Sequence, residues 1–591
     1  MRSEEGKHAF HVMYAAIVFS LVFGFYFNNQ ALGMEPDHDT NKLSANPPRT
    51  KAAASERYDV ITPQMFGAAG DGLTDDTDAF LKLTNYCNSN PGAYVSIPTG
   101  HYIISQPLTF AENVTIRGYG PDSLLDFSQI TDNIGGALQI TGDYREIGQL
   151  ETVHKAGQNM LNCQYTEQWS KGDLIAVIDP EDFSWSNERK YYKKGEFCEI
   201  SSVENGKLTL NSGLLDSYPK GSQLIKMCMA QCVIADLQIA VYDRGDKLGM
   251  TPLKLSCVRD SLIQDIAATG SNYCQIEVKS CYNIQLDQIL ANYICTDNLG
   301  LNYGVLVSNS QFIRITNSTL NSLRHGIAIG GGTEGVCIVN RHITVSDSSI
   351  NSKADSAADV HGNSQFVHYD RCTILNGLGL AGSDIVISNC EVHSGELLSW
   401  VSSRYLVNGN LTVTNNRFYA RSLDKNSNYL FSVFLQPQAY QNNECTIRID
   451  NNSFDFNGEL ALSIRAIDCV NLCTLIMNDN VFKGGDILIE NMHHAYVSGN
   501  VMMSACCFRD AKNIPFSSTE LFTFSENKVY DLAGDGVIVK APFQSKTYVN
   551  IANNIFNDIF GTAVKIEESD NTTAAVYGNI YIQCGNNSTV D

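Results

Sequence analysis

A chain of 591 residues is longer than one ordinary hydrophobic core requires, so it must form several domains or one elongated structure of stacked repeats. Its formal net charge of -22 argues against a nucleic-acid partner, because phosphate binding needs concentrated Lys and Arg, although a local basic groove could still bind an acidic glycan. The 18 cysteines lack the paired spacing of a zinc site and are expected to be mostly buried small residues.

The N-terminal segment predicts export. An uncharged apolar run, Val12–Phe27, follows basic residues, and its length is typical of a signal-peptide core and short for a membrane span. We therefore expect residues 1–33 to be a signal peptide, or an uncleaved signal anchor, since two glutamates weaken the positive charge before the run. The polar, Pro- and Ala-rich residues 34–57 are predicted to be a linker. The protein should be periplasmic, cell-surface or secreted, with membrane contact only through the N-terminal segment 1–33.

The folded part is predicted to span residues 58–591 and to open with a cap. It begins with a short strand, a Gly-Asp-Gly turn that needs positive φ, and a helix that starts at Asp75 or Asp76 and runs to about Asn88. Strands are expected next, within residues 92–105 and 113–120.

The segments FGAAGDGLTDDTDAF, VSIPTGHYIIS and VTIRGYG resemble the N-terminal capping region of the pectate-lyase-like superfamily of right-handed parallel β-helix proteins. That superfamily includes polygalacturonase-like enzymes and bacteriophage tailspike depolymerases. The resemblance implies an all-β fold, a right-handed parallel β-helix, with a polysaccharide as partner. It does not specify the reaction.

A small β module is predicted to be inserted at about residues 143–229. Alternating apolar runs in this stretch are separated by Gly and Asn-Gly turns, which indicates antiparallel strands. The aromatic residues Trp169, Trp185, Tyr191 and Tyr192 could stack on sugar rings or form the core of the module, and we favour the core.

From Cys232 onward a short unit recurs, in which alternating apolar residues precede a polar pair that usually contains Asn or Asp. Examples are IRITNSTL, ITVSDSSI, IRIDNNSF and VNIANNIF. Successive units are roughly 18 to 36 residues apart, which is the period of one β-helix coil. Stacked coils should form one continuous core, with Asn ladders at the turns. The aromatic-rich stretch between Tyr429 and Tyr440 is predicted to be a longer loop.

The main candidate catalytic side chains lie on two neighbouring units of the repeat region. Strand alternation places Arg324, Gly326 and Ala328 on the outward face of RHGIAIG. It also places Asp359 and His361 on the outward face of ADVHG. If these strands are equivalent and one coil apart, the Arg, Asp and His side chains lie close together, and the small residues beside them leave room for a ligand.

Four other residues are weaker candidates. His325 or Tyr369 could act as a general acid, although an inward Tyr369 is more simply a core residue whose hydroxyl finds a partner. His368 is expected on a different strand of the coil, and Arg371 at a turn. Both are candidates for substrate binding.

Arg324, Asp359 and His361 together suit elimination or C5-epimerisation at a uronic acid. Neutralising the uronate carboxylate acidifies the C5 proton, a base removes that proton, and in elimination an acid protonates the leaving oxygen. Arg324 could neutralise the carboxylate, His361 act as base, and Asp359 hold the imidazole in its useful tautomer. The Asp-Val-His element also resembles the Asp-Pro-His-Asp motif of alginate C5-epimerases, but it lacks the proline and the second aspartate.

Two other functions remain open. A glycoside hydrolase needs two carboxyl groups at a set separation, and Asp355 with Asp359 is a candidate pair. A non-catalytic glycan-binding or structural surface protein would show the same repeats. No cofactor or metal site is predicted, but Ca2+ stays open because outward Asp residues are plentiful. A homo-oligomer also stays open.

Overall fold

The computed structural model describes residues 60–590 with internal gaps at 131–134, 183–191, 205, 243–248, 294–300, 333–334, 354, 395–401, 407–409, 421–428, 436–444, 457–459, 467–472, 491, 504–507, 511–520, 541–546 and 568–571. The predicted signal segment and linker lie outside these residues. Among the residues described, no helix combines the length and the apolar character needed to cross a membrane.

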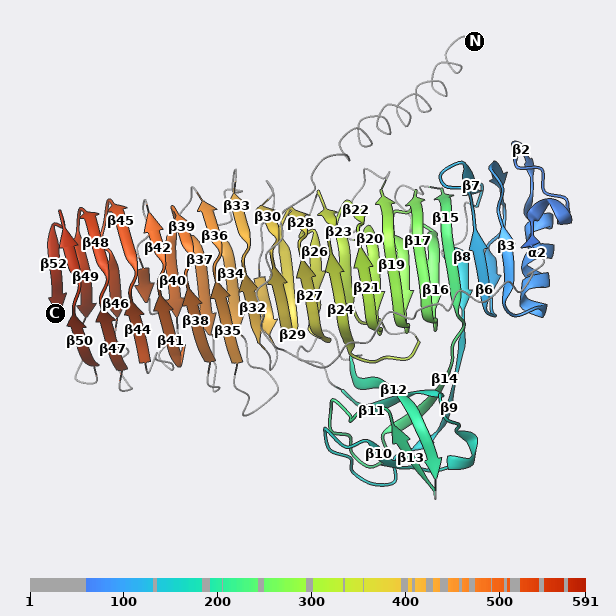
Figure 1. Cartoon of the computed structure of the whole chain (residues 1–591), viewed down its shortest axis with the longest axis horizontal. Coiled ribbons are helices and arrows are strands. Elements are labelled where there is room, and N and C mark those ends of the chain that lie inside the picture. Colours follow the sequence, from blue (N-terminus) through green and yellow to red (C-terminus); the bar gives the residue numbers. More distant parts are fainter. Residues whose placement is uncertain are drawn as a thin grey trace, which may run out of the picture. The chain divides into compact units, whose positions relative to one another are not determined.

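A cap closes the N-terminal end of the folded unit (Figure 1). It consists of β1 (Val60–Ile61), η2 (Pro63–Phe66), β2 (Asp71–Asp75) and α2 (Thr77–Ser89). Asp76 is the N-cap residue, as predicted, and its carboxylate accepts hydrogen bonds from the backbone N–H groups of Ala69 at 2.6 Å and Gly70 at 3.0 Å. Gly70 and Gly72 have φ of +64° and +72°, which confirms the turn that the Gly-Asp-Gly sequence predicts. The apolar face of α2 packs on the first coil.

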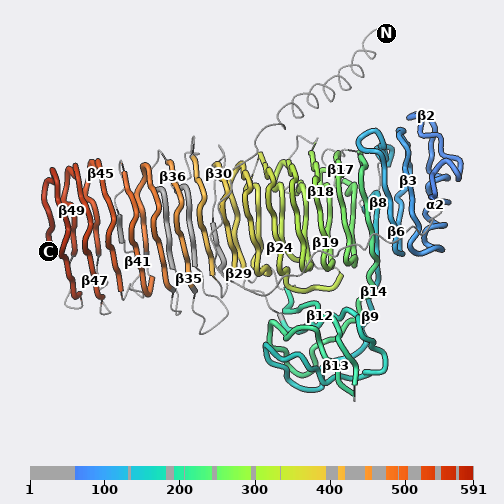
Figure 2. The backbone as a smooth tube through the Cα atoms, viewed as in Figure 1, coloured from blue at the N-terminus to red at the C-terminus, as the bar shows by residue number. Residues whose placement is uncertain are grey.

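The rest of the solenoid is a right-handed parallel β-helix, as predicted, in which each coil pairs with the next along three ladders (Figures 1 and 2). Ladder one contains β5 (Leu108–Phe110), β8 (Gly136–Thr141), β16 (Thr251–Ser256), β18 (Cys274–Lys279), β20 (Tyr303–Ser308), β23 (His325–Gly330), β26 (Ala358–Val360), β29 (Leu378–Ser388), β31 (Ser402–Leu406), β34 (Tyr429–Leu435), β37 (Leu460–Ala466), β40 (Asp486–Glu490), β43 (Phe508–Asp510), β46 (Val537–Lys540), β49 (Thr562–Glu567) and β52 (Asn586–Val590).

Ladder two continues from β1 through β3 (Ala93–Ser96), β6 (Val114–Arg117), β15 (Cys232–Val241), β17 (Arg259–Thr269), β19 (Tyr282–Asn292), β21 (Gln311–Thr316), β24 (Asn340–Ser346), β27 (Ser364–Asp370), the second half of β29, β32 (Leu411–Thr414), β35 (Cys445–Asp450), β38 (Cys473–Asn478), β41 (His494–Ser498), β44 (Leu521–Ser525), β47 (Thr547–Ala552) and β50 (Thr572–Tyr577).

Ladder three continues from β2 through β4 (Gly100–Ile103), β7 (Ser123–Phe127), the second halves of β15, β17 and β19, β22 (Thr319–Asn321), β25 (Ser349–Asn351), β28 (Thr373–Leu375), β30 (Glu391–Ser394), β33 (Arg417–Ala420), β36 (Ser453–Phe456), β39 (Val481–Lys483), β42 (Val501–Met503), β45 (Lys528–Leu532), β48 (Ile555–Ile559) and β51 (Ile580–Ile582).

Stacking of the coils produces one continuous hydrophobic core from the cap to the last coils. The pairing register confirms the repeat length, since Val367 lies opposite Ile385 and Leu411 opposite Ile447, the two extremes of the predicted spacing. The cysteines that the structure describes form no disulfide, and most are buried.

A ladder of buried asparagines stabilises one turn of successive coils, as the repeated Asn predicts. Asn480, for example, is 0 % exposed, and its amide donates to the backbone oxygen of Ile449 at 2.7 Å and to Oδ1 of Asn500 at 2.9 Å. The same pattern joins Asn416, Asn452, Asn480, Asn500, Asn527, Asn554 and Asn579. Within the ladder, each side-chain amide therefore donates to a backbone carbonyl of the preceding coil and to the side-chain oxygen of the next Asn.

The prediction of a longer loop between Tyr429 and Tyr440 is wrong for its first half. Residues Tyr429–Leu435 form β34, which pairs in parallel with β31 and β37. The aromatic-rich, largely apolar sequence that suggested a loop is equally typical of a strand inside a parallel sheet.

The inserted module contains a separate six-stranded antiparallel sheet in the order β10-β13-β12-β11-β14-β9, which lies to one side of the solenoid (Figure 1). Its elements are β9 (Asp143–Gln149), β10 (Met160–Asn162), η3 (Thr166–Gln168), β11 (Leu174–Asp182), β12 (Lys193–Glu204), β13 (Lys207–Leu210) and β14 (Gln223–Cys228). Trp169 is 4 % exposed and belongs to the module's own core. Trp185 and Tyr191 lie outside the described residues.

Candidate functional site

Arg324, Asp359 and His361 gather where β23 and β26 lie side by side in ladder one. The parallel register sets Ala328 opposite Asp359, and one coil further Asp359 lies opposite Gly379. A Cβ atom at Gly379 would stand 2.5 Å from Oδ1 of Asp359, so the small neighbours on both sides make room for this carboxylate.

A chain of charged contacts joins these residues. Arg324 Nε lies 3.3 Å from Oδ2 of Asp355. His325 Nε2 lies 3.9 Å from the same oxygen and 3.7 Å from Oδ2 of Asp359. Asp359 Oδ2 also contacts His361 Nε2 at 2.8 Å. Two carboxylates therefore alternate with three basic side chains.

Asp359 is the electrostatic centre of this group, and its side chain is 20 % exposed. Burial alone would raise the pKa of Asp359, but the charges of His361, His325 and Arg324, with the hydrogen bond from His361, outweigh burial and hold the pKa below its ordinary value. Asp359 is therefore a carboxylate at neutral pH.

Both ring nitrogens of His361 contact protein groups. Because Asp359 is ionised, the nitrogen facing it, Nε2, carries the proton and donates it. The other nitrogen, Nδ1, lies 3.0 Å from the hydroxyl of Tyr192, which comes from the inserted module. In the neutral ring Nδ1 is an acceptor, so the Tyr192 hydroxyl donates to it. His361 itself is 27 % exposed.

His325 and Arg324 are held by their own neighbours. His325 is 3 % exposed, its Nδ1 lies 2.6 Å from the backbone oxygen of Ser356, and its ring stacks on Tyr303 at 5.5 Å. Arg324 Nη1 lies 3.3 Å from the Tyr303 hydroxyl, and the Arg324 side chain is 34 % exposed. Arg324 thus presents its charge at the surface, whereas His325 is buried and contacts the carboxylates of Asp355 and Asp359.

The expectation that Gly326 points outward is wrong. A Cβ atom at Gly326 would lie 2.7 Å from the Ile350 side chain and 2.7 Å from the backbone oxygen of Leu320, so this position faces the interior. Simple alternation fails because β23 begins at a corner of the coil, where Gly326 packs directly against Gly304 of the coil before. His325 thereby reaches Asp359 on the outward face.

Tyr369, His368 and Arg371 are not brought to this cluster. Tyr369 lies in ladder two at 0 % exposure, and burial raises its pKa well above the ordinary value. Its hydroxyl, expected to have a partner, has none among the described residues. His368 contacts Ser388 Oγ at 2.8 Å, and Arg371, at a turn with φ of +50°, pairs with Asp347 at 2.7 Å.

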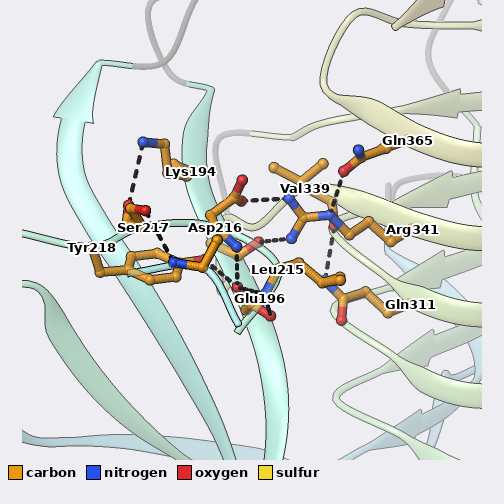
Figure 3. Close-up of polar contacts among 12 residues, drawn as sticks. Lys194, Glu196, Leu215, Asp216, Ser217, Tyr218, Gln311, Val339, Arg341 and Gln365 are labelled. Carbon is orange, nitrogen blue, oxygen red and sulfur yellow. Dashed lines mark hydrogen bonds and ion pairs between the residues drawn. The ribbon is translucent and has the colours of Figure 1, made fainter. Parts of the chain in front are cut away.

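The module that supplies Tyr192 is held on the solenoid through Arg341 of β24, a side chain that is 2 % exposed (Figure 3). Its guanidinium pairs with Asp216 of the module and donates to the backbone oxygen of Gly195 at 3.3 Å and to Oε1 of Gln365 at 2.9 Å. Asp216 belongs to a turn that is held by Glu196. The Glu196 carboxylate accepts hydrogen bonds from the backbone N–H groups of residues 215 and 216. Burial raises the pKa of Glu196, and the Arg341 charge partly offsets this effect.

Apolar packing reinforces this docking. Phe197, Ile225 and Met227 of the module share a buried cluster with Val336 and Ile338 of the solenoid. The module therefore has a fixed seat beside β23, β24 and β26.

The role of Tyr192 was not expected from the sequence. The sequence pattern predicts an aromatic residue of the module core, yet the Tyr192 hydroxyl contacts a histidine 169 residues away. No spacing signal joins two residues at that separation. Among the described residues, no group of three or more His, Cys, Asp or Glu side chains could hold a metal ion.

Two family models match the chain. One, described as Gp49, pectin lyase-like, matches residues 269–511, and the other, described as rhamnogalacturonase A/epimerase, pectate lyase-like, matches residues 63–150. No curated protein matches the sequence.

Several solved structures share the fold. The tailspike protein gp49 from Pseudomonas phage LKA1 is 20 % identical, with a TM-score of 0.58 over 74 % of this chain and 82 % of that chain. The tailspike gp61 of Pseudomonas phage phi297 is 18 % identical, with a TM-score of 0.60 over 83 % and 82 %. The Gp54 tailspike of Acinetobacter baumannii bacteriophage AP22, in complex with A. baumannii capsular saccharide, is 19 % identical, with a TM-score of 0.61 over 83 % and 77 %.

Proposed function

Because this chain belongs to the pectate-lyase-like superfamily of parallel β-helix proteins, we propose that it is an exported protein that binds an acidic polysaccharide and acts on it as a lyase or C5-epimerase at a uronate. The observation that carries the proposal is the chain of charged contacts that links Arg324, through Asp355 and His325, to Asp359 and His361. The complex of the AP22 tailspike with a capsular saccharide supports a polysaccharide as the ligand class.

Arg324 has the charge and exposure to bind the uronate carboxylate. A guanidinium offers five N–H donors, so it can take a second carboxylate beside Asp355. Neutralising the uronate makes the proton on C5 more acidic. This step prepares the sugar for loss of that proton.

The Asp359–His361 pair is the proposed proton acceptor. In elimination the C5–H bond breaks, its electron pair forms the C4–C5 double bond, the C4–O4 bond breaks, and the proton ends on the leaving oxygen. In epimerisation a proton returns to the opposite face of C5 instead. We assign the removal and return of the C5 proton to the Asp359–His361 pair, and not to His361 alone, because both ring nitrogens of His361 already contact protein groups.

A glycoside hydrolase is the second candidate, and one observation favours it. Oδ2 of Asp355 and Oδ2 of Asp359 both lie within 4 Å of His325 Nε2, so the two carboxyl groups stand close enough to flank one glycosidic bond. Asp359, held ionised, would then be the nucleophile or base.

One experiment separates these functions. The protein is incubated with a panel of uronate-containing polysaccharides while ultraviolet absorbance of unsaturated uronate and new reducing ends are recorded. We expect both signals to rise together. Reducing ends without the absorbance would replace elimination by hydrolysis. Exchange of the C5 proton with solvent, with no chain cleavage, would indicate epimerisation. Binding without any of these changes would leave a glycan-binding protein.

A further inference from the structure

The inserted module places one side chain into the candidate site. Tyr192 precedes β12, is 2 % exposed, and contacts His361 through its hydroxyl. Its ring packs over Gly331, where an added Cβ atom would stand 2.7 Å from the ring. The glycine therefore makes the seat that this tyrosine occupies.

Hydrogen bonds between the module and the solenoid also hold the backbone that follows Tyr192. Three residues after Tyr192, Gly195 accepts from Arg341 at 3.3 Å and from the backbone N–H of Val339 at 3.2 Å. Two residues later, the backbone N–H of Phe197 donates to Oε1 of Gln311 at 3.2 Å. A backbone held at two points so close to Tyr192 leaves its ring little freedom to move away from His361.

We infer that the inserted module is part of the functional site and that Tyr192 is a positioning residue, which orients His361 and selects its tautomer. This inference rests on the proposed function. Asp359, His361 and Tyr192 form a chain of hydrogen bonds in which the histidine is held at both nitrogens. Tyr192 acts through His361, because at 2 % exposure it offers almost no surface to a substrate.

A hydroxyl is well suited to this position. It donates to Nδ1 when the ring is neutral and accepts from Nδ1–H when the ring is protonated. His361 can therefore change its charge during proton exchange without losing its orientation. A phenylalanine in place of Tyr192 would fill the same space but leave Nδ1 without this partner.

The test compares Tyr192→Phe with Tyr165→Phe, a matched change at a module tyrosine that is 54 % exposed. Histidine is labelled with 15N in the full chain, and His361→Gln identifies the His361 signals. We expect Nε2 of His361 to be protonated in the wild type, and Tyr192→Phe to shift the Nδ1 signal while Tyr165→Phe does not. This readout needs no substrate, so it tests the contact even if the proposed function fails.

Kinetics test the consequence on a polysaccharide that the wild type turns over. Tyr192→Phe should lower kcat by roughly 10²-fold, change the pH–rate profile and leave KM nearly unchanged, since misplacing a catalytic group acts mainly on the chemical step. An unchanged rate and profile would overturn the inference while the proposed function stands. A higher rate would also overturn it, because Tyr192 would then obstruct His361. A wild type without turnover would refute the proposed function instead.

Discussion

Gly331→Ala should separate Tyr192 from His361 without removing either side chain. The new Cβ atom would lie 2.7 Å from the Tyr192 ring and 2.4 Å from Nδ2 of Asn363, whereas ordinary contacts are 3.4–4 Å. Relief of the ring contact alone requires a shift of about 1 Å, estimated as the overlap that packing must remove. The Tyr192–His361 contact of 3.0 Å would then exceed hydrogen-bonding distance.

The matched control is Gly332→Ala, because a Cβ atom at Gly332 would meet nothing within 4 Å. Both variants add one methyl group at neighbouring positions of the same loop. Overpacking at Gly331 should cost about 1–3 kcal/mol in stability, and the change at Gly332 should cost almost nothing. Thermal melting measures the loss of stability. The 15N spectrum of His361 reports whether the Tyr192 hydroxyl still contacts Nδ1.

The combination of results decides the interpretation. We expect Gly331→Ala to move the Nδ1 signal of His361 in the same direction as Tyr192→Phe. If the signal in Gly331→Ala matches that in Gly332→Ala, then Tyr192 is not seated by Gly331, and the argument from the close approach fails.

Three further outcomes are expected. Asn480→Ala should cost about 2–4 kcal/mol, because it leaves buried amide and carbonyl groups of the neighbouring coils unpaired, and hydrogen exchange should locate the loss in those coils. Arg341→Met should weaken docking of the module by about 3–5 kcal/mol, seen as faster hydrogen exchange in β12, whereas Arg371→Met breaks an exposed ion pair and should cost at most about 1 kcal/mol. The lowered pKa of Asp359 means that the unfolded state binds this proton more tightly, so Asp359 adds stability that is present above the ordinary Asp pKa and is lost as the pH falls through the folded value. Melting temperatures should therefore fall less steeply below about pH 5 in Asp359→Asn than in the wild type, and parallel curves would contradict this account.

Much of the fold follows from local patterns. The cap is readable because Gly70 and Gly72 have positive φ, which few other residues adopt, and because an Asp precedes the helix, at a position where Asp is preferred. The coils are readable because every coil must bury alternating apolar residues and must hydrogen-bond the backbone at the same turn, where an Asn of the ladder recurs. The apolar alternation and the spacing of the Asn residues are both visible in the sequence.

The site is readable only in part. Outward placement of Asp359 and His361 follows from alternation along a regular strand. Alternation misplaced Gly326, because a corner turns the chain there and a glycine packs against the coil before it. The partner of Tyr369 was expected on general grounds, but no neighbour in the described core supplies one.

The sequence by itself determined a capped stack of repeats and its coil length, and the resemblance of the cap implied a right-handed β-helix. Alternation also predicted that Arg324, Asp359 and His361 lie close together on the outward face. Only the tertiary structure decided that the inserted module packs against the solenoid beside these residues and that the Tyr192 hydroxyl contacts His361. The physical reason is that stacking of repeats is dictated by local period, whereas the seat of an insertion depends on contacts such as Arg341 with Asp216, which join segments far apart in the chain.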